Sequence, residues 1–137
     1  MTVADYLIDT SALARVLIAR TTAEWDDRIS VGLVALCDIT ELEVLYSARS
    51  AADRERVKRT LNAHYTWCPT PEGIHRRARV VQELLTAKGE HRSAGPVDLL
   101  VAAAAEEAGL TLLHYDRDFE TIARTTGQPV RMIDLKD

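Results

Sequence analysis

Short apolar segments alternate with helical segments throughout this chain, and no other feature constrains its fold as strongly. The strand candidates are short apolar runs at residues 6–8, 36–39, 110–114 and 130–133. Helical segments separate them, and parallel strands require a long crossover connection of this kind. The pattern predicts an α/β protein with a central parallel sheet and helices on both of its faces.

The helical segments are marked by amphipathic spacing and by residues that begin or end helices. Trp25, Ile29 and Leu33 recur at fourfold spacing, which indicates a helix with Trp25 in the core. Pro96 stands at the start of the most apolar helix, and Gly109 directly follows it. Residues 89–95 are expected to form an exposed loop. The expected helices cover residues 12–19, 22–33, 40–49, 53–64, 71–88, 97–108 and 118–126.

Length and composition favour a single domain over residues 1–137. A chain of 137 residues that is 47% hydrophobic is long enough for one sizeable core. It contains no apolar run of about eighteen residues and no signal-peptide pattern at its start, so we expect a cytoplasmic protein without a membrane span. Cys37 and Cys68 lack the spacing of a zinc site, and Cys37 is expected to be buried.

Four acidic residues stand where a strand ends or a helix begins. Asp9 and Asp116 follow apolar runs, while Glu43 and Asp98 lie near the starts of helices. In an open parallel sheet, strand ends and the starts of neighbouring helices lie at the same edge, where ligand crevices form. The sequence therefore predicts that these four carboxylates gather at one site.

Clustered carboxylates repel one another, and a bound cation relieves that repulsion. Oxygen ligands without histidine or cysteine favour Mg²⁺, with Mn²⁺ as a possible substitute. One ion held mainly by Asp9 and Asp98 is the minimum, and the alternative is two ions, the second completed by Glu43, Asp116 and the substrate. Such ions activate water and stabilise a departing oxygen, as phosphodiester hydrolysis requires.

Neighbouring polar residues compete with these acids or support them. Glu41 and Glu43 point to nearly opposite sides of one helix, so only one of them faces the crevice. Asp118 competes with Asp116, and we expect Asp118 to cap the last helix. Thr10 and Ser11 are expected to hydrogen-bond Asp9 and to hold its orientation.

Each acid also has a purely structural interpretation. Asp9 can cap a turn, and Glu43 follows Thr40 in the T-x-x-E pattern of a capping box. Asp98 lies in a first helical turn, where the helix dipole favours negative charge. Asp116 can be an ordinary turn residue. Only the convergence of all four favours the metal site.

Four sequence motifs, in this order, resemble those of the PIN-domain ribonucleases. They are IDTSAL at residues 8–13, ITELEVLY at 39–46, VDLLVAA at 97–103 and LHYDRDF at 113–119. Within that family the chain looks most like a VapC-type toxin of a bacterial toxin-antitoxin pair, over nearly its full length. The resemblance implies a PIN-like fold.

The resemblance also implies a Mg²⁺-dependent endoribonuclease that a cognate VapB-type antitoxin holds inactive. It implies a homodimer that forms a higher assembly with the antitoxin. The family's acidic metal site carries over to Asp9, Glu43, Asp98 and Asp116. His114 departs from the family pattern, since relatives often have threonine or serine there, and it is expected to be structural.

An RNA substrate requires positive charge near the acidic crevice. The net charge is −4, but setting aside the four site acids leaves equal numbers of acidic and basic side chains. Arg15, Arg20 and Arg92 are the candidate substrate-binding residues. The basic runs at residues 54–59 and 76–79 are expected to be solvated helix faces. Single-stranded or loop RNA is favoured because its bases are accessible.

Two other classes of function compete with the ribonuclease. One is a catalytically silent module that binds RNA or protein, which the presence of all four acids argues against. The other is an aspartyl-phosphate signalling domain centred on Asp9. It is disfavoured because no lysine follows a late strand, and Lys136 is nearly terminal.

Overall fold

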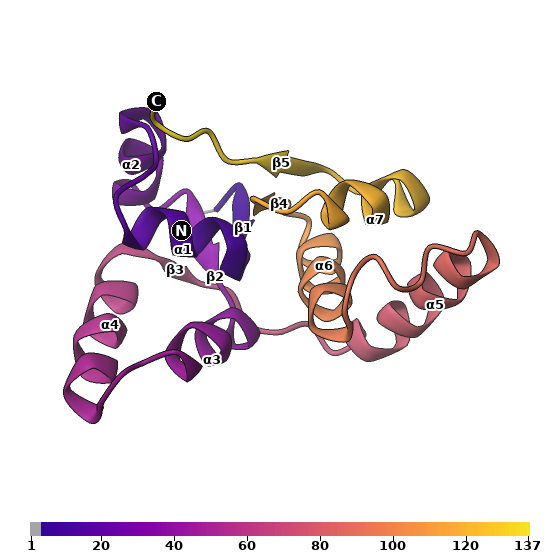
Figure 1. Ribbon diagram of the computed structural model, residues 1–137, viewed down its shortest axis with the longest axis horizontal. Helices are drawn as coiled ribbons and strands as arrows, with labels where there is room; N and C mark the ends of the chain where they lie inside the picture. The colour runs from indigo at the N-terminus through magenta and orange to yellow at the C-terminus, as the bar shows by residue number, and fades with distance from the viewer. Residues whose placement is uncertain (1–3) are drawn as a thin grey trace.

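The computed structural model describes residues 4–137, and a five-stranded parallel sheet lies at its centre (Figure 1). The strands are β1 (Tyr6–Ile8), β2 (Val34–Leu36), β3 (Thr66–Trp67), β4 (Thr111–His114) and β5 (Val130–Met132). Their spatial order is β3-β2-β1-β4-β5. The chain therefore builds outward from β1 on one side and then adds β4 and β5 on the other. Ligand crevices form at the carboxyl ends of strands beside such a reversal.

The side chains of the central strands alternate between two cores. Leu7 of β1 is in register with Ala35 of β2 and with Leu112 of β4, and all three belong to one apolar cluster. The next residues along two of these strands, Ile8 and Leu113, are paired and belong to the other cluster. This period of two buries both faces of the sheet, as expected for parallel strands covered by helices.

The first face is covered by helices from the first half of the chain. They are α1 (Thr10–Leu17), α2 (Ala23–Ser30), α3 (Asp38–Tyr46) and α4 (Ala51–His64). The indole of Trp25 is fully buried here and meets the Tyr6 ring edge-on, with 5.0 Å between ring centroids. The expected core position of Trp25 is therefore confirmed.

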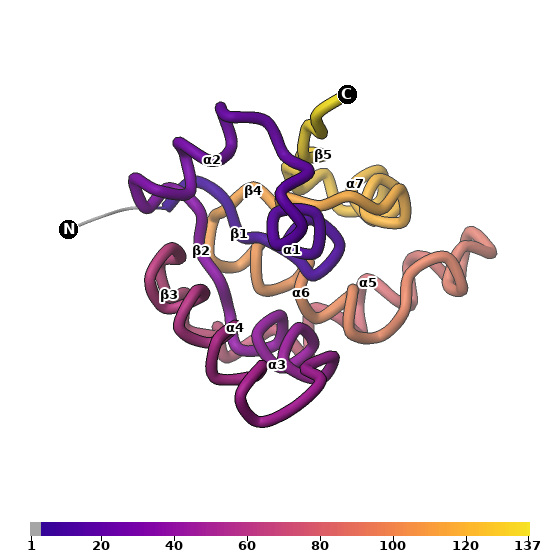
Figure 2. The backbone as a smooth tube through the Cα atoms, turned by 60° about the vertical axis from the view of Figure 1, so that its left-hand side comes forward, coloured from indigo at the N-terminus to yellow at the C-terminus, as the bar shows by residue number. Residues whose placement is uncertain are grey.

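The second face is covered by α5 (Ile74–Ala87), α6 (Pro96–Ala108) and α7 (Asp118–Thr126). The run of alanines at residues 102–105 is buried, and these small side chains bring α6 close to the sheet. In both overall views α5 and α7 lie on the opposite side of the molecule from α3 and α4 (Figures 1 and 2).

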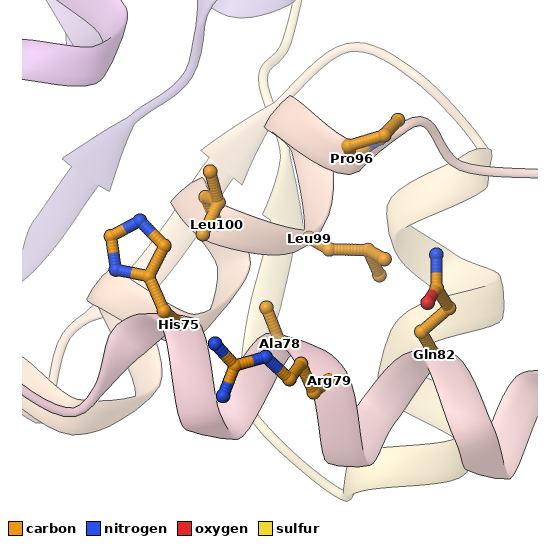
Figure 3. Close-up of a pocket in the computed structure, with 7 residues that line it drawn as sticks. All are labelled: His75, Ala78, Arg79, Gln82, Pro96, Leu99 and Leu100. Carbon is orange, nitrogen blue, oxygen red and sulfur yellow. The ribbon is translucent and has the colours of Figure 1, made fainter.

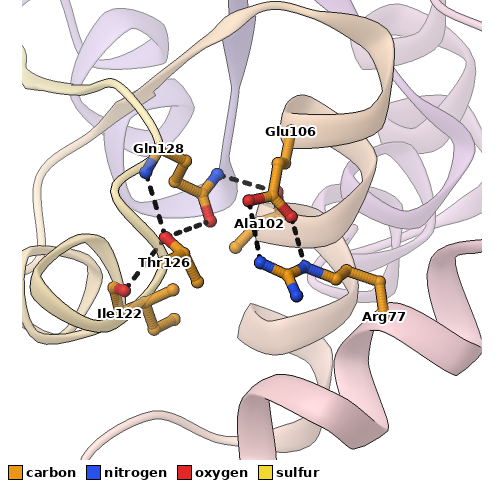
Figure 4. Close-up of polar contacts among 6 residues, drawn as sticks. All are labelled: Arg77, Ala102, Glu106, Ile122, Thr126 and Gln128. Atoms are coloured by element: carbon orange, nitrogen blue, oxygen red, sulfur yellow. Dashed lines mark hydrogen bonds and ion pairs between the residues drawn. The ribbon is translucent and has the colours of Figure 1, made fainter.

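Polar contacts fix the relative positions of the helices on this second face (Figure 4). Arg77 of α5 donates two hydrogen bonds to the Glu106 carboxylate of α6, at 2.6 and 3.1 Å. The buried Gln128 side chain donates to the Ala102 carbonyl of α6 at 2.9 Å, and its backbone N–H donates to the Thr126 hydroxyl at 3.1 Å. These bonds tie α5 and the end of α7 to α6.

The C-terminal segment returns to the start of the chain. Thr21 and Leu135 form an isolated antiparallel bridge, and the Lys136 N–H donates to the Arg20 carbonyl at 2.8 Å. Figure 1 shows this segment reaching α2. Across residues 4–137, no helix combines the length and the apolar character that crossing a bilayer would need.

The predicted α/β class, with helices on both faces of a parallel sheet, is confirmed. The expected strand at 36–39 is misplaced, because β2 is Val34–Leu36 and Cys37 already caps α3. The two-residue edge strand β3 was not predicted, since so short a segment carries no periodicity. The other helices begin or end within a few residues of their expected limits, and residues 89–95 form the expected loop between α5 and α6.

Candidate metal and active site

Asp9 leaves the end of β1 and caps α1 at the same time. Its carboxylate accepts the backbone N–H groups of Ser11 and Ala12, at 3.2 and 3.3 Å. The Ser11 hydroxyl lies 2.8 and 3.0 Å from its two oxygens, so the expected support from Ser11 is present. The structural interpretation of Asp9 as a cap is therefore correct, although capping does not explain its burial.

Burial makes Asp9 electrostatically unusual. Its side chain is almost fully buried, with the residue only 4% exposed. Desolvation raises the pKa of Asp9 to about 6, against the lowering effect of the Ser11 and Ala12 hydrogen bonds and with a smaller raising effect from the Asp98 charge. A neighbouring cation would favour the ionised form of this carboxylate.

Asp98 reaches the same edge of the sheet from α6. The last turn of this helix leads into the amino end of β4, so its first turn lies beside the carboxyl ends of the strands. The Asp98 carboxylate accepts the Gly95 N–H at 3.2 Å, which is the capping role that a first-turn acid suggests. Burial raises the pKa of Asp98, and the charges of Asp116, Glu43 and Asp118 raise it further.

Glu43 approaches from α3 and is held by the first turn of α1. The Thr10 hydroxyl donates to its carboxylate at 2.7 Å, across thirty-three positions of sequence. Thr10 was expected to bond Asp9, and this prediction is wrong, because its hydroxyl bonds Glu43 instead. The capping-box interpretation of Thr40 and Glu43 is also wrong, because α3 begins earlier, with Cys37 as its cap. Glu43 is thus free of a capping role.

The cap expected of Asp118 is not formed, and Asp116 closes the turn before α7 instead. The Asp118 N–H donates to the Asp116 carboxylate at 2.9 Å, and the Phe119 N–H donates to the Asp116 carbonyl at 3.1 Å. Asp116 therefore closes the turn before α7, while Asp118 is the first helical residue and caps nothing. Burial and the Asp116 charge raise the pKa of Asp118.

The four acids thus share one electrostatic field at the carboxyl edge of the sheet. Asp98 links them. Beyond the effect of burial, its charge raises the pKa of Asp9, and the charges of Asp116 and Glu43 raise the pKa of Asp98. Among residues 4–137, no three Asp, Glu, His or Cys side chains already surround a single point as ligands. The acids of the site are held instead by hydrogen bonds from Ser11, Thr10, Gly95 and Asp118.

His114 lies under this edge as a buried neutral residue. Its Nδ1 accepts the Asp116 N–H at 3.2 Å, so the ring carries its proton on Nε2. Nε2 lies 3.5 Å from a Glu120 oxygen without a hydrogen bond, and the ring packs against Phe119. Burial lowers the pKa of His114. Its contact with Asp116 is through the backbone, which supports the expected structural role.

The three candidate arginines occupy different places. Arg15 lies on α1, and its guanidinium is 4.8 Å from the centre of the Tyr115 ring. Tyr115 immediately precedes Asp116 in the sequence. Arg92 is exposed in the turn that precedes α6. Arg20 lies beyond the C-terminal end of α1, whereas Asp9 caps its N-terminal end.

Sequence reasoning did not single out Tyr115. Its backbone N–H donates to the Ser11 hydroxyl at 2.8 Å, and its ring carries the Arg15 guanidinium. These contacts join the end of β4 to the first turn of α1. The position between His114 and Asp116 was the only sequence signal that pointed to it.

Comparison with known proteins identifies relatives over most of the chain. The PIN domain family matches residues 6–125. The ribonuclease VapC2 of Mycobacterium tuberculosis (strain CDC 1551 / Oshkosh) is 45% identical over 130 residues, which cover 93% of this chain and 92% of the relative. Ribonuclease VapC21 of the same strain is 40% identical over 128 residues, covering 93% of each chain.

Solved structures share the fold at low sequence identity. VapBC2 from Rickettsia felis, bound to a DNA fragment from its promoter, matches with a TM-score of 0.76 and 15% identity, covering 97% of this chain and 100% of that one. DNA-bound VapBC from Salmonella typhimurium gives 0.75 and 19%, with coverages of 94% and 98%. Each match shows that the arrangement of sheet and helices in this chain is a known fold.

Proposed function

This chain belongs to the PIN domain family, and we propose that it is a Mg²⁺-dependent endoribonuclease of the VapC type, with Asp9, Glu43, Asp98 and Asp116 as its acidic site. The family resemblance predicted from sequence is thereby confirmed. One observation carries the catalytic proposal. Burial raises the pKa of Asp98, and the charges of Asp116 and Glu43 raise it further, while the pKa of Asp9 is raised by burial and, to a smaller extent, by the Asp98 charge. Carboxylates that raise one another's pKa are the arrangement that a cation stabilises.

The donor set fits a hard divalent cation. All four proposed ligands are carboxylates, and the buried histidine beside them uses Nδ1 to accept a backbone N–H. Mg²⁺, with Mn²⁺ as substitute, is the ion that such a set favours. When bound, the ion supplies a more acidic water and stabilises charge on the departing oxygen. Asp9 and Asp98 would hold it, with Glu43 and Asp116 completing the site.

The surrounding residues fix the acids in place before substrate arrives. Ser11 bonds Asp9 and also accepts the Tyr115 N–H, so one hydroxyl couples two strand ends. Thr10 holds Glu43 at 2.7 Å. Holding catalytic groups by such outer contacts removes freedom that would otherwise be lost during the reaction. A water molecule is the nucleophile in this proposal, and no covalent intermediate forms on the chain.

Single-stranded or loop RNA is the proposed substrate. Arg15 and Arg92 lie on the two segments that flank the acids, α1 and the turn before α6. Their charges can hold phosphates on either side of the bond that is cut. The location of Arg20 at the far end of α1 makes it a weaker candidate, which would act only on a longer RNA.

We further propose that a VapB-type antitoxin controls the enzyme. The support is that the relatives are named VapC ribonucleases and that the structural neighbours include complexes named VapBC. On this basis we propose a homodimer that joins a larger assembly with the antitoxin. We also propose that residues 1–137 form one PIN domain and act on RNA in the cytoplasm.

The proposal is tested by paired variants in an RNA cleavage assay. Glu43→Gln and Asp98→Asn should lower the cleavage rate at least about 100-fold, since each removes a ligand. Glu41→Gln, on the same helix as Glu43, is the matched control and should cleave like the parent. Asp98→Asn keeps an oxygen for the Gly95 N–H, so circular dichroism should show an unchanged fold.

Metal dependence is tested in the same assay. Excess chelator should stop cleavage, and added Mg²⁺ should restore it. Normal cleavage by Asp98→Asn, or by the parent protein in chelator, would refute the acidic metal site. RNA binding by the parent without metal-dependent cleavage would instead favour a silent binding module.

A further inference from the structure

A small pocket lies between α5 and the first turn of α6, the turn that also carries Asp98. Its volume is about 190 Å³. Figure 3 shows side chains of the two helices facing one another across it, with His75 and Gln82 toward its two ends. Ala78, Pro96, Leu99 and Leu100 form apolar walls, while His75, Arg79 and Gln82 form a polar rim. The proposed catalytic site does not account for this pocket.

The polar rim is not used by the fold. Within residues 4–137, the side chains of His75, Arg79 and Gln82 take part in no hydrogen bond or ion pair. The nearby Arg77 differs, because Glu106 neutralises it at 2.6 Å and ties it to α6. The guanidinium of Arg79 is therefore available to a ligand at the opening of an apolar pocket. The expectation that residues 76–79 form a solvated helix face does not explain why Arg79 lines this pocket.

The first turn of α6 connects the pocket to the acids. Pro96 and Leu99 line the pocket, and Asp98 between them faces the proposed metal site. Adjacent residues of a helix point about 100° apart, and a helix with its side chains is about 10 Å thick. When an RNA strand is held at Asp98, a neighbouring nucleotide of that strand can therefore reach the pocket.

We propose that this pocket binds one base of the RNA substrate, next to the bond that is cut. The proposal rests on the proposed ribonuclease function. A volume of about 190 Å³ is below the usual range for whole drug-sized ligands and suits a single planar ring system. Leucine and alanine walls take one face of the ring and the Arg79 guanidinium stacks on the other, while the Gln82 amide and His75 imidazole bond its edge.

The shape and charge of the pocket favour a base over a second protein. The exposed apolar side chains of α5, Val80 and Leu84, are absent from the pocket lining. An apolar protein segment would be expected to use them. Among the described residues, the lining contains the cationic Arg79 and no Asp or Glu, which suits a polyanionic ligand.

The test combines base removal with substitution of the rim. Single-stranded oligoribonucleotides from a cleaved RNA are prepared with one base missing at each position in turn. Binding is measured by fluorescence anisotropy in the Asp9→Asn background with Mg²⁺, and cleavage rates are measured with Asp9 intact. Arg79→Ala, Arg79→Lys and Gln82→Ala are compared with the control Arg76→Ala, which removes an exposed cation of the same helix outside the pocket.

At one position beside the cut, loss of the base should weaken binding to the parent protein at least about 5-fold. That loss should be much smaller in Arg79→Ala and in Arg79→Lys, which keeps the charge without the flat group. Arg76→Ala should keep the full loss. Equal losses in the parent and in Arg79→Ala at every position would overturn the pocket proposal, as would a change in oligomeric state without this coupling. Absence of RNA cleavage by the parent would instead refute the proposed function.

Discussion

Replacing Asp9 by asparagine is expected to stabilise the metal-free protein at neutral pH while it abolishes RNA cleavage. The carboxylate is almost fully buried, and desolvation is the largest influence on its pKa. Asparagine is as good a helix cap as aspartate, and its side-chain oxygen can accept the N–H groups of Ser11 and Ala12. The substitution therefore removes a buried charge and keeps the cap.

The magnitude follows from the pKa of this carboxyl group. A pKa of 3.8 in the unfolded chain and about 6 in the folded one costs the folded state about 3 kcal/mol when both are ionised. Between pH 4 and pH 6 the folded state binds more protons than the unfolded state, so its free energy of unfolding falls as the pH rises. This cost is already net of the hydrogen bonds from Ser11 and Ala12, which lower the pKa, so removing the charge should gain about 3 kcal/mol at pH 7.5.

Urea denaturation in excess chelator, followed by circular dichroism at several pH values, measures this gain. Asp9→Asn should gain stability over the parent as the pH rises from 4 to 7.5, and the gain should shrink when Mg²⁺ is added to the parent. Asp27→Asn is the control, because Asp27 is exposed on α2 and no hydrogen bond or ion pair is recorded for its carboxylate within residues 4–137. A pH-independent difference between Asp9→Asn and the parent would refute the assignment of a buried, destabilising charge.

Three further substitutions probe the supports of the site. Ser11→Ala should lower the free energy of unfolding by about 1–3 kcal/mol in urea denaturation, because it leaves Asp9 and the Tyr115 N–H without their shared partner, whereas Ser30→Ala should cost little. Burial lowers the pKa of His114, so the unfolded state binds the extra proton and stability should fall as the pH drops below about 6.5. His114→Asn should reduce that fall, and an unchanged acid-side slope in denaturation midpoints would contradict it. Gln128→Ala should lower the urea midpoint by the equivalent of about 1–2 kcal/mol through loss of its bond to α6, and an unchanged midpoint would show that this bond is not needed.

Several local features of the fold were predictable because their causes are local. Pro96 begins α6 and Gly109 ends it with a φ of 72°, a backbone conformation that glycine adopts readily. The short apolar runs around Leu7 and Leu112 predicted buried strands, since a parallel sheet covered on both faces buries consecutive apolar residues. The limits of β2 and the existence of β3 were not predictable, because pairing between distant segments decides them.

The sequence by itself determined the fold class and the family, because short motifs and the order of strands and helices indicate both. It also predicted the four acids as a site, and that remains a prediction. Only the tertiary structure decided the partners of those acids. Thr10 bonds Glu43, and Asp116 closes the turn before the helix that Asp118 was expected to cap. The helices α5 and α6 meet to form a pocket that Pro96 and Leu99, on either side of Asp98, help to line. These arrangements depend on the distances between separate segments, which follow from packing and hydrogen bonding in three dimensions.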